Sequence, residues 1–266
     1  MRMKQASRLA PEFPTDLSWL LSNPQRLKQH RGVPVVLFFW SRGCVAGLEL
    51  LAQAQQWLNR YQDRGLRVIG IHAPEYAFER DLGALESMLF DRGYTVPVAV
   101  DQAGEVMASY RNHWRPRLYI LNANGEIIWD EAEQISYRKT EELVRDVLRR
   151  AGAKGVSGPF VQTVSDLEHE RRLLGYSGNA VSNRHQVYRG IEHTYRTPGR
   201  GSHPQLIGTW RVEADYAASV GGQVVLPYFG SQVYVTLDMR RAGRPAHVSA
   251  QRGHFSRGQA GNDVTF

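Results

Sequence analysis

The stretch PVVLFFWSRGCVAGLELL, residues 34–51, decides the fold of this chain. Its first part, PVVLFFW (34–40), is continuously apolar and rich in β-branched and aromatic residues, which predicts a central strand buried on both faces. A short break, SRG, leads to Cys44, and apolar residues then recur at helical spacing at Leu48, Leu51, Ala54, Leu58 and Tyr61. This spacing predicts an amphipathic helix over residues 44–64.

A second buried strand is predicted over LRVIGIH, residues 66–72. Parallel strands need a crossover connection, so residues 34–72 form a β-α-β unit. The remaining predicted elements are an inserted helix at 81–92, a strand at 97–100, a short helix at 105–110, a hairpin of RLYIL and EIIWD around residues 122–125, and a closing helix at 139–150. The fold class is therefore α/β, with a central mixed sheet flanked by helices, over residues 1–150 with their N-terminal extension.

The second half of the chain has a different character. Residues 151–164 are predicted to be a linker, because AGAKGVSGP is rich in Gly and Ala and contains one helix-stopping Pro. Residues 165–238 are predicted to be a small all-β sandwich module, since TWRVEADYAAS, QVVLPYF and QVYVTLD alternate apolar and polar residues. Residues 239–266 lack an apolar face and are predicted to be a basic, disordered tail.

The charge distribution argues against a nucleic-acid partner. The net charge of +7 is concentrated late in the chain: residues 1–150 carry 20 Lys and Arg against 18 Asp and Glu, whereas residues 151–266 carry 13 against 8. Most of the later excess lies beyond Met239. This basicity belongs to a solvated tail, so no nucleic acid is expected to bind.

Two expectations concern the compartment. No run approaches the roughly 18 to 20 apolar residues of a membrane span, and MRMKQASRLA at the start lacks the apolar run of a secretory signal. The chain as written is therefore expected to be soluble and cytoplasmic, without a membrane span.

Cys44 is the only cysteine among 266 residues, which excludes an intrachain disulfide. Any redox chemistry must therefore involve a second molecule. A cysteine that opens a helix meets unpaired backbone N–H groups and the positive end of the helix dipole, and Arg42 adds positive charge. These features predict a thiol with a lowered pKa and raised reactivity. The alternative is that Cys44 is a small buried hydrophobic residue.

The sequence resembles the TlpA/DipZ branch of the thioredoxin-like superfamily, a group of redoxin domains, in FFWSRGCVAGLELL, IHAPEYAFERD and NHWRPRLYILNANGEI. Members carry Trp-Thr/Ser-x-x-Cys-x-x-Cys at the strand-to-helix turn, and Trp40, Ser41 and Cys44 match this motif. The resemblance covers residues 10–150 and implies a thioredoxin-like fold. It also implies that Pro116 is the cis-proline that faces the active cysteine and helps an extended substrate to pair with adjoining backbone. The alternative for Pro116 is an ordinary trans turn proline.

Two departures from the family pattern bear on activity. Gly47 stands where the resolving cysteine would be, and Arg115 stands before the proline where the family usually has Trp, with the aromatic residue moved back to Trp114. Without a resolving thiol, internal attack cannot release a mixed disulfide at Cys44, so exchange must wait for an external thiol. The dithiol reductase cycle is therefore excluded.

Three functions remain open for the first domain. In the first, Cys44 acts as a monothiol and forms mixed disulfides with a protein or with a low-molecular-weight thiol such as glutathione. In the second, the domain is a redox-inert scaffold. In the third, Cys44 reacts with peroxide. The peroxide reading ranks last, because Ser41 fits a peroxidatic motif but Leu37 stands where proline is required. Glu75 is a candidate for proton transfer to a leaving thiol, with a solvated loop carboxylate as the alternative. His72 reads as a structural histidine.

No cofactor or metal is expected, since the nine histidines and single cysteine show no ligand spacing. The β-rich module is similar to the β-sandwich that follows the thioredoxin-like domain in DipZ-type proteins, where a carbohydrate-binding-like shape suggests a weak carbohydrate contact. Its aromatic residues are interpreted as core rather than as a sugar-stacking face: Tyr188, Tyr195, Trp210 and Tyr228. The family resemblance also favours a location outside the cytoplasmic membrane. This differs from the cytoplasmic location expected from the sequence MRMKQASRLA.

Overall fold

The computed structural model describes residues 8–161, 192–195, 205–213, 217–219 and 221–225. The chain divides into two compact units, residues 1–169 and 170–266, which are described separately. The first unit contains the segment that decides the fold and the single cysteine.

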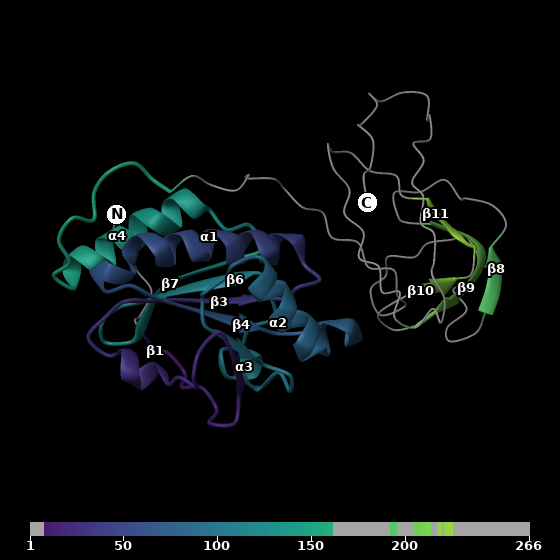
Figure 1. The fold of residues 1–266 in the computed structure, drawn as a ribbon, viewed down its shortest axis with the longest axis horizontal. Coiled ribbons are helices and arrows are strands. Elements are labelled where there is room, and N and C mark those ends of the chain that lie inside the picture. The colour runs from purple at the N-terminus through teal and green to yellow at the C-terminus, as the bar shows by residue number, and fades with distance from the viewer. Residues whose placement is uncertain (1–7, 162–191, 196–204, 214–216, 220, 226–266) are drawn as a thin grey trace. The chain divides into compact units, whose positions relative to one another are not determined.

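Two parallel strands form the centre of the first unit (Figure 1). Strand β3 (Val35–Trp40) pairs in parallel with β4 (Arg67–His72), in a register that runs from Val35 opposite Arg67 to Trp40 opposite His72. Helix α1 (Val45–Tyr61) makes the crossover between them. The predicted β-α-β unit is confirmed. Both strands end at the same edge of the sheet, where Cys44 begins the helix.

Five further strands complete a seven-stranded mixed sheet in the order β1-β7-β6-β3-β4-β5-β2. Strand β5 is parallel to β4, β6 is antiparallel to β3, and the predicted hairpin joins β6 to β7. The short strands β1 and β2 pair antiparallel with β7 and β5 and extend the two edges. The bounds are β1 (Arg8–Leu9), β2 (Ser18–Leu20), β5 (Val98–Val100), β6 (Arg117–Leu121) and β7 (Glu126–Ala132).

The helices cover both faces of this sheet. Figure 1 shows α1 and α4 side by side on one face and α3 on the other. The bounds are α2 (Leu82–Asp91), α3 (Glu105–Ser109) and α4 (Tyr137–Arg150), with short 3-10 helices η1 (Leu27–His30), η2 (Gln62–Arg64) and η3 (Ala77–Arg80). The closing helix starts two residues before the predicted 139, because Tyr137 is buried and packs edge-on against Trp57 of α1.

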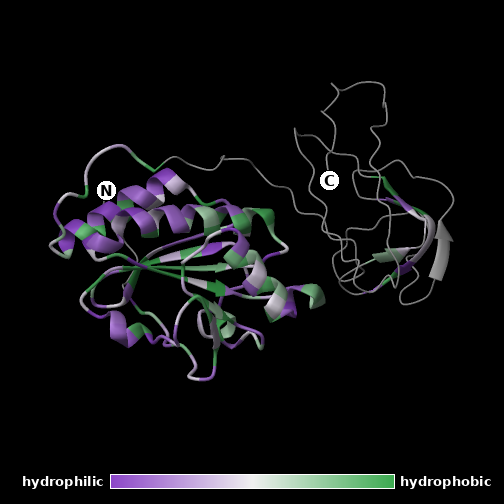
Figure 2. Ribbon diagram, in the orientation of Figure 1, coloured by the Kyte–Doolittle hydropathy of each residue, from purple (hydrophilic) through white to green (hydrophobic). Residues whose placement is uncertain are grey.

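The side chains of β3 point alternately into two separate hydrophobic cores, one on each face of the sheet. Val36, Phe38 and Trp40 lie in the core shared with α1 and α4. The other three residues of β3 pack with α3 and the N-terminal segment: Val35, Leu37 and Phe39. All six side chains are almost completely buried, and Figure 2 shows the hydrophobic colour concentrated in the central strands. A strand buried on both faces is what the unbroken apolar run predicted.

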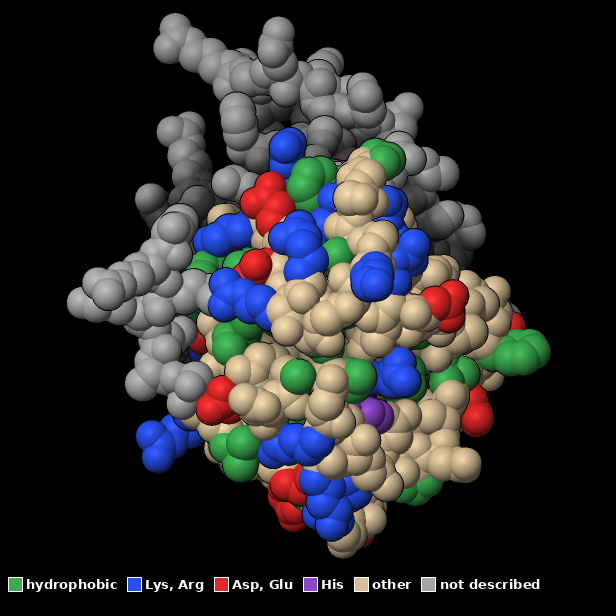
Figure 3. Space-filling model, turned by 90° about the vertical axis from the view of Figure 1, so that its left-hand side faces the viewer, with side chains coloured by type: hydrophobic (Ala, Val, Ile, Leu, Met, Phe, Trp, Pro, Cys, Tyr) green, Lys and Arg blue, Asp and Glu red, His purple; other side chains and the backbone are tan. Residues whose placement is uncertain are grey.

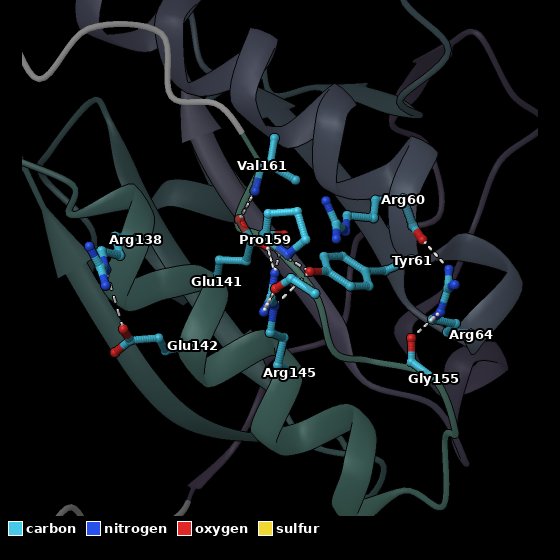
Figure 4. Close-up of polar contacts among 11 residues, drawn as sticks. Arg60, Tyr61, Arg64, Arg138, Glu141, Glu142, Arg145, Gly155, Pro159 and Val161 are labelled. Atoms are coloured by element: carbon cyan, nitrogen blue, oxygen red, sulfur yellow. Dashed lines mark hydrogen bonds and ion pairs between the residues drawn. The ribbon is translucent and has the colours of Figure 1, made fainter.

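Residues 151–161, which follow α4, pack against the rest of the first unit. The buried guanidinium of Arg145 donates to the carbonyl oxygens of Gly158 and Pro159, both at 2.8 Å, and the amide of Val161 donates to Glu141. Arg145 also pairs with Glu141 at 2.7 Å, and Tyr61 donates to the same carboxylate (Figure 4). The Gly- and Ala-rich composition predicted a linker from residue 151. As far as residue 161, however, hydrogen bonds hold this segment to α4, because backbone carbonyl oxygens accept from the buried Arg145 side chain.

In the second unit, four antiparallel strands are described: β8 (Glu192–Tyr195), β9 (Gln205–Val212), β10 (Ala217–Ser219) and β11 (Gln223–Val225). Strand β9 pairs with each of the other three. The stretch TWRVEADYAAS, whose alternation predicts half-buried β structure, divides between β9 and β10, which pair antiparallel with Ala217 opposite Val212. Trp210 is buried. Tyr188, Tyr228, the strand predicted at 232–238 and the predicted tail lie outside the described residues, and so does the sandwich as a whole.

Two surface findings concern the described residues. None of their helices has the length and apolar character needed to cross a membrane. Figure 3 shows that basic and acidic side chains intermingle on one face of the molecule, with Lys and Arg gathered in its upper half.

Candidate functional site

Cys44 lies at the carboxyl edge of β3 and β4, as the N-cap residue of α1. It is a free cysteine with an exposed fraction of 8%. Its sulfur lies 3.6 Å from the carbonyl oxygen of Arg115, to which the thiol donates a weak hydrogen bond. The peptide bond between Arg115 and Pro116 is cis, and Pro116 is buried directly before β6. The structure therefore brings the cysteine and the proline loop, which are 72 positions apart in sequence, into contact.

The loop before Cys44 is a tight turn fixed at several points. The amide of Cys44 donates to the carbonyl oxygen of Ser41 at 3.2 Å. Trp40 and Ser41 are fully buried beneath it. The amide of Gly43 donates to a carboxylate oxygen of Glu79 at 2.6 Å. A Cβ atom on Gly43 would lie 2.8 Å from that same oxygen, so only glycine fits the approach.

Glu79 is the buried carboxylate of the site, with no exposed surface. Its second oxygen accepts from the amides of Glu75 and Tyr76, at 2.6 and 2.8 Å. One side chain therefore ties the cysteine loop to the loop that follows β4. Glu75, the carboxylate predicted for the site, is half-buried in the same loop, whereas the role of Glu79 was not predicted. The available signal was the spacing from Tyr76 to Glu79, which forms a capping box around η3.

His72 is the last residue of β4 and contacts the turn before Cys44. Its Nε2 atom accepts from the backbone amide of Arg42 at 3.3 Å, and its ring packs edge-on against Trp40. Burial, with the positive charges of Arg42 and Arg115, lowers the pKa of His72 to about 3. The imidazole is therefore neutral near pH 7 and acts as a hydrogen-bond acceptor for the loop, not as a base in the ordinary pH range.

This lowered pKa makes stability depend on pH. Between the unfolded value of 6.5 and about 3, the unfolded chain takes up a proton at His72 that the folded chain does not. Stability is therefore lost as pH falls below 6.5, by up to about 1.4 kcal/mol per pH unit from this group. We expect His72→Gln, whose amide oxygen can replace Nε2 as acceptor, to lower this slope between pH 6 and 5 in urea unfolding measurements. Equal slopes in both proteins would show that His72 titrates normally when folded.

Arg42 and Arg115 approach the turn from two different loops. A side-chain nitrogen of Arg42 donates to the carbonyl oxygen of Phe78, and the guanidinium lies over the Phe78 ring. The Nε atom of Arg115 donates to the carbonyl oxygen of Ala73 at 2.8 Å. Trp114, next to Arg115, is a large apolar side chain with 48% of its surface exposed. The site therefore has a positively charged margin and one exposed aromatic residue.

Gly47 lies buried in the first turn of α1, three residues beyond Cys44. A Cβ atom there would lie 3.1 Å from the carbonyl oxygen and 3.3 Å from the amide nitrogen of Ser41. The backbone turn therefore packs closely against this glycine. Among the described residues, no cluster of three His, Cys, Asp or Glu side chains could hold a metal ion.

Comparisons with known proteins agree with this geometry. Residues 7–130 match the AhpC/TSA family. DipZ of Mycobacterium tuberculosis is 28% identical over 267 aligned positions, which cover 89% of this chain and 37% of that protein. The thiol-disulfide oxidoreductase YkuV of Bacillus subtilis is 25% identical, over 52% of this chain and 93% of YkuV.

A solved structure shows the same fold. The solution structure of a thioredoxin-like protein in the oxidized form aligns with a TM-score of 0.50 and 25% identity, over 56% of this chain and 99% of the other. The chain spans little more than a third of the length of DipZ, but its alignment with DipZ is longer than the first unit alone. Residues 7–130 therefore have a thioredoxin-like fold and match the AhpC/TSA family, and the chain is similar to DipZ and to the thiol-disulfide oxidoreductases YkuV and ResA.

Proposed function

We propose that this protein exchanges disulfides through Cys44 alone. The Cys44 thiolate attacks one sulfur of an external disulfide, a Cys44–substrate disulfide forms, and the other sulfur leaves as a thiolate that takes up a proton. A second external thiolate then attacks the substrate sulfur of the mixed disulfide and releases Cys44 as a thiolate. No net oxidation of the protein results, and both co-reactants are external thiols or disulfides.

The observation that carries this proposal is the contact between the Cys44 sulfur and the carbonyl oxygen of Arg115, directly before a cis-proline. A nucleophile beside an irregular backbone segment is well placed to meet an extended substrate, which can pair with the backbone at Trp114 and Arg115. Pro116 shapes this segment, and next to it the exposed side chain of Trp114 provides an apolar surface for substrate contact. The redox activity of relatives such as YkuV and ResA, as their names state it, supports the same chemistry.

The position of Cys44 at the start of a 17-residue helix favours its thiolate, as do the nearby guanidinium groups. Two features act in the other direction: the sulfur has little exposure, and the thiol donates to a carbonyl oxygen that a thiolate cannot use. We infer that the helix terminus and the guanidinium groups dominate, because a sulfur donor at 3.6 Å makes only a weak hydrogen bond.

The test is the reaction of the full chain with a disulfide and an alkylating reagent. We expect one mixed disulfide per chain by mass spectrometry, none in Cys44→Ser, and release by added thiol. We expect the alkylation rate to reach half its maximum below about pH 8.5, the value for a free thiol. The same chain in denaturant is the matched control. A half-maximum at or above that of the denatured chain, with no mixed disulfide, would count against the proposal.

The alternative is a redox-inert docking protein that keeps the fold. The low exposure of Cys44 and the glycine at position 47 favour it. A folded chain that fails to react with small disulfides, while Cys44 reacts normally after unfolding, would select this alternative. A location outside the cytoplasmic membrane and a weak carbohydrate contact of the second unit stay predictions from the family resemblance.

A further inference from the structure

Arg115 contributes both its backbone carbonyl and its side chain to the site. Its carbonyl oxygen accepts from the Cys44 thiol at 3.6 Å, while its side-chain Nε donates to the carbonyl oxygen of Ala73 at 2.8 Å. The amide of Ala73 in turn donates to the carbonyl oxygen of Trp40, at the end of β3. The guanidinium is thus held at the strand ends from which the cysteine loop departs.

The outer part of the Arg115 side chain is available to a ligand. Arg115 is half-buried, and its fixed Nε leaves two terminal amino groups that make no ion pair with any Asp or Glu in the described part of the chain. Glu79, the buried acid of the site, points its oxygens at three backbone amides. A guanidinium that is anchored at one nitrogen and open at the others is suited to bind a carboxylate in bidentate fashion.

A second positive charge reinforces the first. Arg42 lies in the cysteine loop, and both guanidinium groups contribute to the depressed pKa of His72. Their positive potentials therefore overlap at the carboxyl ends of β3 and β4. Charges arranged around a narrow site raise the local concentration of ligands of opposite sign.

We propose that the disulfide attacked by Cys44 carries a carboxylate close to its sulfur, and that Arg115 binds this carboxylate. The proposal rests on the monothiol exchange proposed above and names its substrate class. The carboxylate belongs either to a small thiol or to an acidic residue beside a cysteine in a peptide. In either case the guanidinium positions the substrate sulfur for attack and takes no part in bond breaking.

The experiment measures rates of mixed-disulfide formation with three small disulfides of similar size. These are dithiodipropionate, which is anionic, hydroxyethyl disulfide, which is neutral, and cystamine, which is cationic. Each rate is compared between the wild-type chain and Arg115→Gln, so the intrinsic reactivity of each disulfide cancels. We expect the variant to lose about five- to tenfold with the anionic disulfide, to change less than about twofold with the neutral one, and to gain with the cationic one.

Matched controls separate this effect from others. Arg138→Gln removes one positive charge from an exposed side chain of α4 and should leave all three ratios unchanged. A pair of short peptides, with the cysteine flanked by Asp or by Asn and activated as a mixed disulfide, distinguishes the source of the carboxylate. Dependence on Arg115 with only the small disulfide or only the Asp peptide supports the proposal and identifies that source.

Two results would overturn the proposal in different ways. If the wild-type chain reacts with all three disulfides and Arg115→Gln changes each rate by the same factor, the charge recognition is wrong but the exchange function stands. If the wild-type chain forms no mixed disulfide with any probe, both proposals fail together.

Discussion

Replacing Gly47 with cysteine is expected to convert the single-thiol site into a dithiol site and to accelerate release of a mixed disulfide from Cys44 by about a thousandfold. The new thiol lies three residues along the same helix, close enough for a disulfide with Cys44. An internal thiol with an effective molarity of about 1 M competes with about 1 mM of external thiol, which gives this factor. Stopped-flow release of a chromophoric thiol from preloaded Cys44 measures it.

The structure also predicts what this substitution costs. A Cβ atom at position 47 would lie 3.1 Å from the Ser41 carbonyl oxygen, so the loop has to move by a few tenths of an ångström. We expect a loss of about 1–2 kcal/mol in the free energy of unfolding, as for modest overpacking. Gly47→Ser is the matched control, because it adds the same Cβ atom without a sulfur. Equal release rates in Gly47→Cys and Gly47→Ser would show that the missing thiol is not what limits turnover.

The main sheet could be predicted from the sequence because its signals are local. An unbroken apolar run marks β3 and a second run marks β4, and the helical spacing after Cys44 marks α1. The turn at residues 122–125 marks the hairpin of β6 and β7. The two-residue strand β1 has no such signal. It exists because β7 presents an open edge, which is a property of the assembled sheet.

The site was only partly predictable, for a related reason. Cys44 and Gly47 follow from a motif. For the buried carboxylate, the spacing from Tyr76 to Glu79 is a local signal for a capped turn, but which of Glu75 and Glu79 turns toward the cysteine loop depends on the assembled fold. The hydrogen bonds that hold residues 151–161 to α4 could not be predicted, for the same reason. Composition indicated a linker, whereas the carbonyl oxygens of Gly158 and Pro159 satisfy the buried Arg145 from another element.

Glu79→Ala is expected to lower the free energy of unfolding by about 3–5 kcal/mol, since it removes a fully buried side chain and leaves the partly buried amides of Gly43, Glu75 and Tyr76 without their acceptor. It should also change the chemistry of Cys44. A loop released from Glu79 no longer holds the sulfur at the helix N-terminus, so the alkylation profile should move toward that of the denatured chain. Urea unfolding measures the first effect and alkylation between pH 6 and 10 the second.

Only the second measurement identifies Glu79 as a positioning residue, because any buried hydrogen-bonding side chain would show the first. Glu86→Ala, which removes an exposed carboxylate from α2, should leave both measurements unchanged. Glu79→Gln is the more telling variant, since its amide oxygen can still accept from Gly43 while its NH₂ group cannot accept from Glu75 or Tyr76. If Gln keeps the wild-type alkylation profile and Ala does not, the bond to Gly43 is what positions the cysteine. A normal profile in both variants would mean that Glu79 stabilises the fold and leaves the reactivity of Cys44 to the helix terminus alone.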